Sequence, residues 1–457
     1  MMEGVSLEGK AQHNKDAEKF LAKNKGQVLG VLEDPAEREL VQRFSEDSAE
    51  ILSADDERRL TDILERFETK IFEHEKPEAD PGAKRVLVTS DNPGSWNAVK
   101  PLIAALEQDA RCKSVIAVVS GVAGKQFEEA YPSFGRVQGE KTVLGDAISL
   151  ADREPIDAVV ASVSDKNGPE DLALFGGKGN LGARKTFFIF EGYGGVGGAF
   201  NLGTKDQMEK IDGIFCNDAF AQALVHKLLP DYPTDHIYAT GTLAAEGFEL
   251  DKATEYRAET RAKLGIGTDA FAVLYLGDVS ADYAKVPGAH PNINTKTFEE
   301  TLAGIETFVG AGKRDVALIV RPHPRDPDKE KLVNAGENER LPENLSVKNG
   351  SRPFSINEVA YASDVLVSIA GTENFFAPAR GRRSIFLAYD GPGFAGDAFR
   401  SFYGPELIEA IRQTPGVFIA SSSAELAEIL ERISKEPLPT PVGTSAVVAG
   451  VLDKILG

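Results

Sequence analysis

Arginine and histidine side chains gather at the end of a short apolar run in the second half of the chain. The run Val-Ala-Leu-Ile-Val at 316–320 leads into Arg321, His323 and Arg325, with a proline between each pair. The prolines restrict the loop, and arginine binds phosphate oxygens through its planar fork of donors. We therefore expect a phosphate or diphosphate to bind here. The alternative is a surface turn whose arginines pair with neighbouring carboxylates.

A glycine-containing turn follows a second β-branched run. The run at 365–368 continues into Ile-Ala-Gly-Thr-Glu-Asn and then into a predicted helix. Ser368, Gly371 and Thr372 would lie at the N-terminus of that helix, where free amides, a hydroxyl group and the helix dipole favour an anion. The alternative is that Thr372 simply caps the helix, a role that needs no ligand.

Short β-branched runs alternate with helical stretches from residue 83 onward. This pattern predicts βαβ units on parallel sheets. Ligands of such sheets lie beyond the carboxyl ends of the strands, where both motifs are found. The predicted strands are 85–89, 114–119, 157–162, 186–190, 213–217 and 237–240 in the first half, and 271–276, 316–320, 345–347, 365–368, 384–387 and 417–420 in the second half.

These patterns predict five regions along the chain. Residues 1–80 form an acidic helical extension without strands, in which an amphipathic helix starts near Ser53 and includes Leu60, Phe67 and Ile71. That helix either packs on its own protein or forms a partner surface, so a homodimer through the N-terminal helices is one expectation. The other regions are a first Rossmann-like domain at 83–245, a connector at 246–268, a second Rossmann-like domain at 269–440 and a C-terminal helix at 441–457 that is expected to return to the first domain.

The composition is that of a globular protein with a strongly negative charge. The formal net charge of −20 disfavours nucleic acid and anionic membranes as partners. There is no apolar run of transmembrane length and no leader-like N-terminus, so we expect a cytoplasmic location. Cys112 and Cys216 lack the spacing of a metal site or a disulfide framework. No Asp-x-Asp pair follows a predicted strand either, so we expect no essential metal.

The two motifs and their surroundings resemble the donor-nucleotide domain of the GT-B superfamily. The shared features are the His-Pro loop, the run ASDVLVS at 362–368 with the Gly-Thr-Glu that follows, and the run GRRSIFL at 381–387. The segment 211–244 is similar to the end of the first GT-B domain, and the order of elements matches over 83–457. The superfamily includes nucleotide-sugar glycosyltransferases and UDP-GlcNAc 2-epimerases. The resemblance implies an α/β fold of two Rossmann-like domains whose parallel sheets face a central cleft, here with an N-terminal helical extension.

The resemblance also implies roles for the residues of the second domain. Arg321 and His323 look like phosphate contacts of a nucleotide-sugar donor, and Arg325 is a third candidate. The diphosphate turn would comprise Ser368, Gly371 and Thr372, followed by Glu373, which could accept hydrogen bonds from a ribose or sugar hydroxyl. Gly277, just after the first strand of this domain, would allow a close approach to the phosphates. The loop at 352–354 lies where such folds hold the base.

The first domain would then supply the acceptor side and a general base. Asp91 is the leading candidate, because it lies in the first strand-to-helix loop and could take the proton of an acceptor hydroxyl. A turn or capping role for Asp91 is equally consistent with the sequence. Asp165 and Glu191, at the ends of two further predicted strands, are the reserves. The glycine-rich segment 191–198 either closes on a substrate or is a connecting loop without chemistry.

The activity expected from this resemblance is sugar transfer from a nucleotide sugar, UDP-linked or CMP/CDP-linked, to an unknown acceptor, with no cofactor. One alternative is a non-hydrolysing UDP-GlcNAc 2-epimerase. Epimerases carry a His-Val-Glu-Ala-Gly-like run where this chain has FFIFEGYGG at 187–195, which keeps only the glutamate and a glycine. The other alternative is a non-catalytic nucleotide-sugar binder or scaffold.

Overall fold

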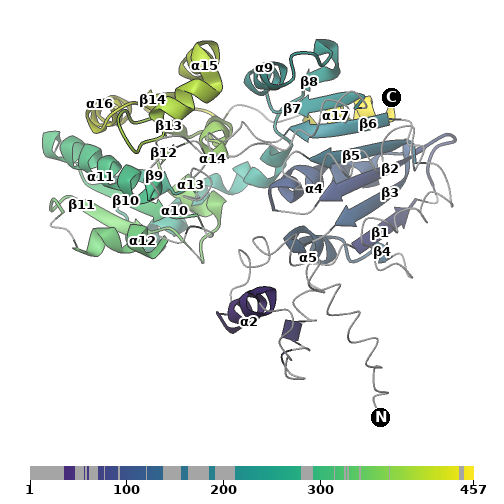
Figure 1. Cartoon of the computed structure of the whole chain (residues 1–457), viewed down its shortest axis with the longest axis horizontal. Helices are drawn as coiled ribbons and strands as arrows, with labels where there is room; N and C mark the ends of the chain where they lie inside the picture. The colour runs from purple at the N-terminus through teal and green to yellow at the C-terminus, as the bar shows by residue number, and fades with distance from the viewer. Residues whose placement is uncertain are drawn as a thin grey trace. The chain divides into compact units, whose positions relative to one another are not determined.

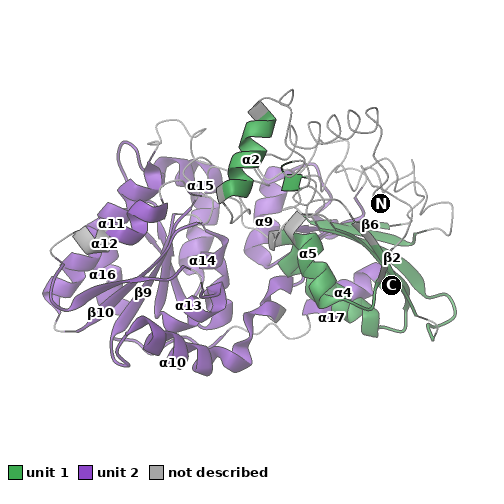
Figure 2. Ribbon diagram, turned by 90° about the horizontal axis from the view of Figure 1, so that it is seen from below, with its two compact units in different colours: residues 1–187, 456 green, residues 188–455, 457 purple. Residues whose placement is uncertain are grey.

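The computed structural model forms two compact units, residues 1–187 with 456 and residues 188–455 with 457 (Figure 2). All structural statements below concern the residues whose placement is described. These are 35–46, 56, 59–60, 70–76, 78–90, 93–119, 121–136, 156–162, 185–190, 211–278, 292–312, 314–323, 326, 329–338, 341–351, 353–369, 371–441 and 447–457.

The first sheet has eight strands in the order β4-β1-β3-β2-β5-β6-β7-β8 (Figure 1). Strand β2 pairs in parallel with β3 and β5, and β7 pairs in parallel with β8. The central strands are almost entirely buried, which explains why they read as continuous apolar runs. The strands are β1 (Lys70–Glu75), β2 (Lys84–Ser90), β3 (Cys112–Val119), β4 (Gly135–Arg136), β5 (Ala158–Ser162), β6 (Lys185–Phe190), β7 (Gly213–Cys216) and β8 (Ile237–Ala239).

Helices α4 (Pro93–Gln108) and α5 (Gly121–Ala130) pack against this sheet through an aromatic cluster. The ring of Phe127 lies at its centre, 4.9 Å from Phe72 on β1, 5.9 Å from Trp96 on α4 and 5.2 Å from Phe134. Rings in such edge-to-face and tilted arrangements contribute beyond their buried area. The cluster therefore packs the first turn of α4 against α5 and β1.

Strand β1 is a difference from the sequence expectation. The extension was expected to be helical through Ile71, but Lys70–Glu75 is a strand antiparallel to β3. The carboxylate of Glu73 receives Arg85 Nη2 at 2.7 Å and Ser114 Oγ at 3.2 Å, so the sheet itself binds this strand. A six-residue segment with mixed polarity has no decisive period, and the tertiary contact determines its structure. Helix α2 (Pro35–Glu46) is the helix of the extension for which the structure gives bounds.

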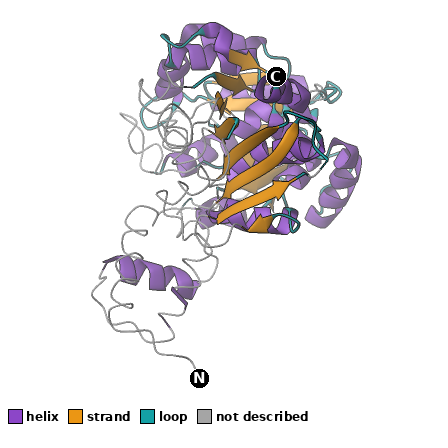
Figure 3. Ribbon diagram, turned by 90° about the vertical axis from the view of Figure 1, so that its right-hand side faces the viewer, coloured by secondary structure: helices purple, strands orange, loops and turns teal. Residues whose placement is uncertain are grey.

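The second sheet has six parallel strands in the order β11-β10-β9-β12-β13-β14 (Figure 1). Figure 3 shows the strands in orange. The chain passes from β9 outward to β10 and β11, and then returns to the other side of β9 for β12, β13 and β14. The winding therefore reverses between β9 and β12. The strands are β9 (Phe271–Leu276), β10 (Val316–Arg321), β11 (Leu345–Asn349), β12 (Val365–Ser368), β13 (Arg383–Leu387) and β14 (Val417–Ala420).

Both faces of the second sheet are covered, because its strands carry buried apolar residues on each side. The turns are specified locally: Ser355 caps α13 and forms a capping box with Glu358, while Ser422 caps α16. The remaining elements are α9 (Ala219–Leu228), η1 (Thr234–His236), η2 (Leu243–Phe248), η3 (Leu250–Lys252), α10 (Ala253–Leu264), α11 (Ile293–Ala311), α12 (Lys329–Asn338), α13 (Ile356–Ala362), α14 (Thr372–Phe376), η5 (Pro378–Arg380), α15 (Gly396–Gln413), α16 (Ser423–Ile433) and α17 (Val447–Leu456).

Helix α10, in the expected connector, is attached to the second sheet by one buried carboxylate. Asp364, just before β12, accepts hydrogen bonds from Arg257 at 2.7 Å, Arg261 at 2.9 Å and the amide of Ala272 at 2.8 Å. Arg261 is 4% exposed and also donates to the carbonyls of residues 267, 268, 270 and 362. Burial lowers the pKa of the Arg261 guanidinium, and the charge of Asp364 opposes that shift.

Helix α17 contacts the first sheet, as its position at the end of the chain predicted. Lys454 Nζ lies 4.5 Å from the centre of the Tyr238 ring on β8. Gly241, with a φ of 103°, touches Val447, and a Cβ at this glycine would lie 2.4 Å from a Val447 methyl group. The absence of a side chain at 241 therefore allows the start of α17 to reach β8.

Within the described residues, no helix combines the length and apolarity needed to cross a membrane. Cys112 on β3 and Cys216 on β7 are free and buried, in agreement with two reduced cysteines on strands. Burial raises the pKa of the Cys112 thiol to about 12.

Replacing Asp364 with alanine should destabilise the second domain strongly. The change leaves the Arg261 cation and the Ala272 amide buried without their acceptor, which typically costs about 3–5 kcal/mol. Urea unfolding monitored by far-UV circular dichroism would measure the change in the free energy of unfolding. Glu259→Ala is the control: its pair with Lys263 is on the same α10 but exposed, so its loss should change stability by less than about 0.5 kcal/mol. Equal effects of both variants would contradict the assignment of Asp364 as the anchor.

Candidate functional site

The carboxyl ends of β10, β9 and β12 lie next to one another at the point where the winding of the second sheet reverses. Arg321 is the partner of Leu276 across β10 and β9, and Val367 is the partner of Tyr275 across β12 and β9. The amide of Gly277 donates to the carbonyl of Arg321 at 3.0 Å, which extends the pairing one residue beyond the strand. Crevices of this kind bind ligands in open parallel sheets.

Gly277 and Asp278 lie between the two predicted motifs. A Cβ at Gly277 would lie 3.1 Å from the Cα of Pro322 and 3.4 Å from the amide nitrogen of His323. On the other side, a Cβ at Gly371 would lie 3.9 Å from Asp278 Oδ1. The His-Pro loop and the glycine turn therefore flank the same short segment. Gly277 allows the close approach of the His-Pro loop, and the approach to phosphates stays a prediction.

Arg321 is partly engaged in holding a loop. Its Nη1 donates to the carbonyl of Gly350 at 2.7 Å and to that of Phe354 at 2.8 Å, which closes the loop expected to hold a base. Its Nε and Nη2 have no hydrogen-bond partner within the described part of the chain. Burial lowers the pKa of the Arg321 guanidinium, and the charges of Glu373 and Glu358 oppose that shift. Arg321 therefore has both a structural role and unused donors.

A buried polar network supports the His323 loop, and its members had no predicted role. Asp326 is 1% exposed, and its amide donates to the carbonyl of His323 at 2.9 Å. Asn294, on α11, donates to Asp326 Oδ2 at 2.5 Å and to the carbonyl of Asp278. Tyr275 donates in turn to the carbonyl of Asn294 at 3.2 Å. The sequence offered one signal, the position of Asp326 shortly after the apolar run 316–320. Its partner Asn294 is far away in the sequence, so the pair could not be predicted.

The glycine turn differs from the predicted anion site in two ways. Ser368 Oγ accepts the amide of Gly371 at 2.9 Å, so this amide is satisfied within the protein. Helix α14 spans only five residues, and Gly371 rather than Thr372 is its N-cap, without a side-chain cap. A helix this short has little dipole to offer an anion. The amides of Thr372 and Glu373 have no backbone acceptor among the described residues, and these two remain as donors.

Glu373 is paired inside the protein through one of its oxygens. Its Oε2 accepts Arg380 Nη1 at 2.5 Å, and the Arg380 side chain is 2% exposed whereas that of Glu373 is 30% exposed. Oε1 has no hydrogen-bond partner within the described residues. The expected role of Glu373 toward a hydroxyl group therefore rests on this second oxygen.

The next turn of α14 contacts α9, an element that follows the first sheet's β7. The ring of Phe375 stacks on that of Phe220 with centroids 5.2 Å apart, and it also lies 4.7 Å from Phe386. Lys227, at the end of α9, donates to the carbonyl of Tyr403 at 2.7 Å, beside the kink of α15 at Gly404. These contacts connect the surroundings of the glycine turn to α9.

Four of the predicted site residues lie outside the described part of the chain. They are Asp91, Asp165, Glu191 and Arg325, so their predicted roles remain predictions. The flanks of Asp91 are described: Ser90, at the end of β2, and Ser95, in the first turn of α4, share a hydrogen bond of 2.7 Å between their buried hydroxyl groups. This contact joins both ends of the loop that carries Asp91.

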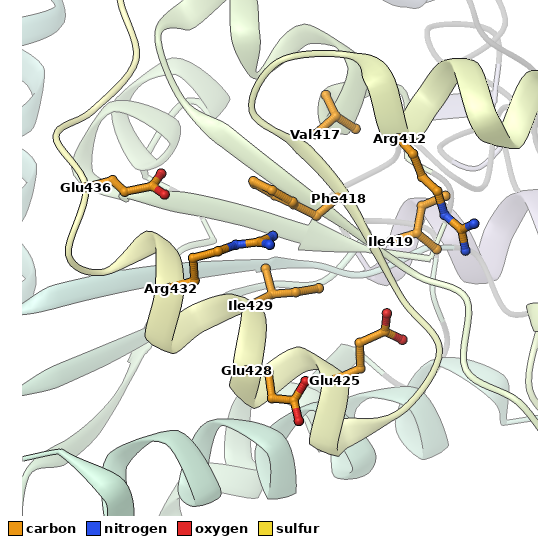
Figure 4. A pocket seen from close by; sticks show the side chains of 9 residues that line it. All are labelled: Arg412, Val417, Phe418, Ile419, Glu425, Glu428, Ile429, Arg432 and Glu436. Atoms are coloured by element: carbon orange, nitrogen blue, oxygen red, sulfur yellow. The ribbon is translucent and has the colours of Figure 1, made fainter.

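The described residues contain no group of three His, Cys, Asp or Glu side chains arranged to hold a metal ion. A surface hollow of about 580 Å³ is present at the edge of the second sheet, between β14 and α16 (Figure 4). It shares no residue with the predicted site. Its lining includes Arg412, Phe418, Glu428, Arg432 and Glu436, a mixture of opposite charges around apolar side chains that indicates no particular ligand.

No protein-family model and no curated protein sequence matches this chain. Solved structures do match. The UDP-GlcNAc 2-epimerase of Neisseria meningitidis bound to UDP-GlcNAc has a TM-score of 0.54 at 11% identity, over 81% of this chain and 99% of that one. The UDP-GlcNAc 2-epimerase of Methanocaldococcus jannaschii has a TM-score of 0.54 at 14% identity, over the same shares of the two chains.

The MnaA protein of S. aureus, solved with UDP, has a TM-score of 0.52 at 13% identity, over 81% of this chain and 96% of that one. At identities this low the matches show the fold. The expected α/β fold of two Rossmann-like domains, the GT-B fold, is confirmed.

Replacing Gly277 with alanine should disturb the contact between β9 and the His-Pro loop. The new Cβ would press on the backbone of Pro322, which the proline ring keeps stiff, and overpacking of this kind costs about 1–3 kcal/mol. Thermal unfolding would measure it. The control is Gly267→Ala, whose Cβ would have an ordinary contact of 4.0 Å with Ala270. An unchanged melting temperature for Gly277→Ala would show that the loop adjusts freely.

Proposed function

We propose that the carboxyl edge of β10, β9 and β12 binds the diphosphate of a nucleotide sugar, and that the enzyme transfers the sugar to an acceptor. One observation carries the proposal: the His-Pro loop and the glycine turn flank the Gly277–Asp278 segment where the winding of the sheet reverses. This juxtaposition brings Arg321 and two amides without a backbone acceptor among the described residues to one place, in a chain whose formal charge is −20.

The donors available to a diphosphate come from both motifs. Arg321 contributes its unused Nε and Nη2, and the glycine turn contributes the amides of Thr372 and Glu373. His323, and Arg325 as a further cation, complete the proposed set. Charge-assisted hydrogen bonds of this type are about twice as strong as neutral ones, so a few of them suffice to hold the phosphates. UDP is the first nucleotide to test, because structural neighbours were solved with UDP-GlcNAc and with UDP.

The same residues would assist departure of the nucleotide. As the bond between sugar and phosphate breaks, negative charge grows on the diphosphate, and preorganised donors stabilise it most at that moment. The loop that Arg321 closes would hold the base, and Oε1 of Glu373 would accept a hydrogen bond from a hydroxyl group of the ribose or sugar. Asp91 is our proposed base for the acceptor hydroxyl, with Asp165 and Glu191 as reserves; general base catalysis typically contributes about 10² to 10⁴ in rate.

A 2-epimerase activity is the second candidate, and the structural matches favour it. They extend over 99% of the Neisseria meningitidis epimerase and 99% of the Methanocaldococcus jannaschii epimerase, so both domains of those proteins are represented here. Against this stands the segment after β6, where the run FFIFEGYGG lacks the histidine that the epimerase resemblance implies. We keep transfer as the primary proposal, because it requires a donor site and one base but no such histidine.

Other features of the molecule remain proposals alongside this function. We propose domains at 83–245 and 269–440, joined by the connector at 246–268. Strand β1 of the extension adds to the sheet of the first domain, and the N-terminal helices of the extension are the proposed surface of a homodimer. We also propose a cytoplasmic location and catalysis without a metal.

UDP should raise the melting temperature of the protein, because a ligand that binds only the folded state stabilises it by mass action. A tenfold excess over Kd corresponds to about 1.4 kcal/mol. Arg321→Ala and His323→Ala should each reduce the shift, and Arg321→Lys should retain part of it because the charge remains. CDP, CMP and GDP serve as competing nucleotides.

Arg412→Ala is the matched control for these variants, since Arg412 is an exposed arginine outside the proposed site. Its response to UDP should equal that of the parent. If Arg321→Ala and His323→Ala also respond like the parent, the donor site lies elsewhere.

Activity assays should distinguish the candidate functions. Purified protein is incubated with UDP-GlcNAc, with and without a mixture of sugar and lipid-alcohol acceptors, and the nucleotides are separated by ion-exchange chromatography. Transfer predicts free UDP only when an acceptor is present. Conversion of UDP-GlcNAc to its 2-epimer without an acceptor would establish the epimerase instead, and tight binding without turnover would establish a binder.

A further inference from the structure

The connector contains a residue in an unfavourable backbone conformation. Glu249, between η2 and η3, has a φ of 51° and a ψ of 50°, and it is the one non-glycine residue with a positive φ in the described part of the chain. Side chains rarely adopt this left-handed conformation, which persists where surrounding contacts over-determine it. The structure therefore poses the question of what holds Glu249 in place.

Both carboxylate oxygens of Glu249 are bound. Oε1 receives Lys252 Nζ at 2.7 Å, while Oε2 receives Tyr256 Oη at 2.9 Å and Asn357 Nδ2 at 3.3 Å. These donors hold the pKa of the Glu249 carboxyl below its usual value, with Lys252 as the main cause. Lys252 and Tyr256 are near neighbours along the chain, whereas Asn357 belongs to α13 on the second sheet. Asn357 is therefore the long-range partner of the Glu249 carboxylate, in addition to the anchor of α10 at Asp364 and the hydrogen bond of Tyr361 to the carbonyl of Phe248.

Asn357 joins the connector to a buried arginine. Its Nδ2 also donates to the carbonyl of Gly247 at 2.7 Å, and its Oδ1 accepts Arg380 Nε at 3.3 Å. The guanidinium carbon of Arg380 lies 3.9 Å from the centre of the Phe248 ring, so the arginine contacts the connector a second time. Asn357 is 8% exposed and Arg380 is 2% exposed, and solvent screens these interactions little.

Arg380 ends the series at the proposed donor site. Its Nη1 donates to Glu373 Oε2 at 2.5 Å, and Glu373 directly follows the first residue of α14 at the glycine turn. One continuous set of contacts, Glu249–Asn357–Arg380–Glu373, therefore runs from the left-handed residue of the connector to the glycine turn. We name it the connector network.

We propose that the connector network couples the conformation of the connector to the glycine turn, and that Arg380 is a positioning residue that aims Glu373. The part of this inference that concerns nucleotide rests on the proposed function. The contacts of Arg380 are to protein groups. Its Nε and Nη1 donate to Asn357 and Glu373, and its guanidinium plane lies over the Phe248 ring. We therefore assign it a positioning role and not a ligand contact. Release of the restraint at Glu249 should thus loosen the turn, and a nucleotide held by the turn should tighten the connector.

The test compares amide hydrogen exchange in the full chain, with peptides that cover 246–252 and 371–377. The variants are Glu249→Gly, which suits the left-handed conformation and removes the carboxylate, and Asn357→Ala, which interrupts the network in the middle. Asp251→Gly is the matched control, because it places a glycine in the same η3 at an exposed position outside the network. Arg380 is left intact because its deep burial makes its replacement a test of folding.

Without ligand, Glu249→Gly and Asn357→Ala should each accelerate exchange at 371–377 at least threefold, and Asp251→Gly should leave it unchanged. With saturating UDP, the parent should exchange more slowly at both peptides, whereas Asn357→Ala should show protection at 371–377 only. Unchanged exchange at 371–377 in Glu249→Gly and Asn357→Ala would overturn the coupling. Absence of any UDP effect in the parent would count against the donor site instead, and the comparison without ligand would still decide the coupling.

Discussion

In a parallel sheet, each right-handed crossover places its helix on one face of the sheet. Where the winding direction reverses, the connections of two adjacent strands leave in opposite directions, and the carboxyl ends of those strands stay open to a ligand. In this protein the reversal falls between β9 and β12. The tight approach of Gly277 to Pro322 then brings the end of β10 to the same place. The loops that carry arginine, histidine, serine and glycine meet there because the topology requires it.

Arginines in the connector and in the second domain hold the backbone around them. Arg261, Arg321 and Arg382 each bind several backbone carbonyls, and Arg380 binds two side chains. A guanidinium group has five donors in one plane and can satisfy the carbonyls at helix and loop ends that would otherwise be buried without partners. Arg321, which we propose as a phosphate contact, therefore also fixes the backbone around it. Its replacement would remove loop geometry as well as any contact to a phosphate.

The sequence was sufficient for most of the architecture, and both candidate motifs lie at neighbouring strand ends as it predicted, whereas their role as a binding site stays a prediction. The strands at 271–276 and 365–368 were predicted with the bounds that the structure has, because buried parallel strands are uninterrupted apolar runs. Strand β1 was missed because its pairing with β3 and the contact of Glu73 with Arg85 are tertiary interactions, which periodicity does not reveal. The carbonyl contacts of Arg321 and the role of Asn294 were missed for the same reason. Which residue acts as the base stays a prediction.

The return of α17 to β8 has a consequence for how the protein is made. Gly241 contacts Val447, and the ring of Tyr238 contacts Lys454. Both partners are synthesised only after the entire second sheet. During translation, domains generally fold in the order in which they emerge. Here the contacts of Tyr238 and Gly241 with α17 can form only after the ribosome has made all six strands of the second sheet.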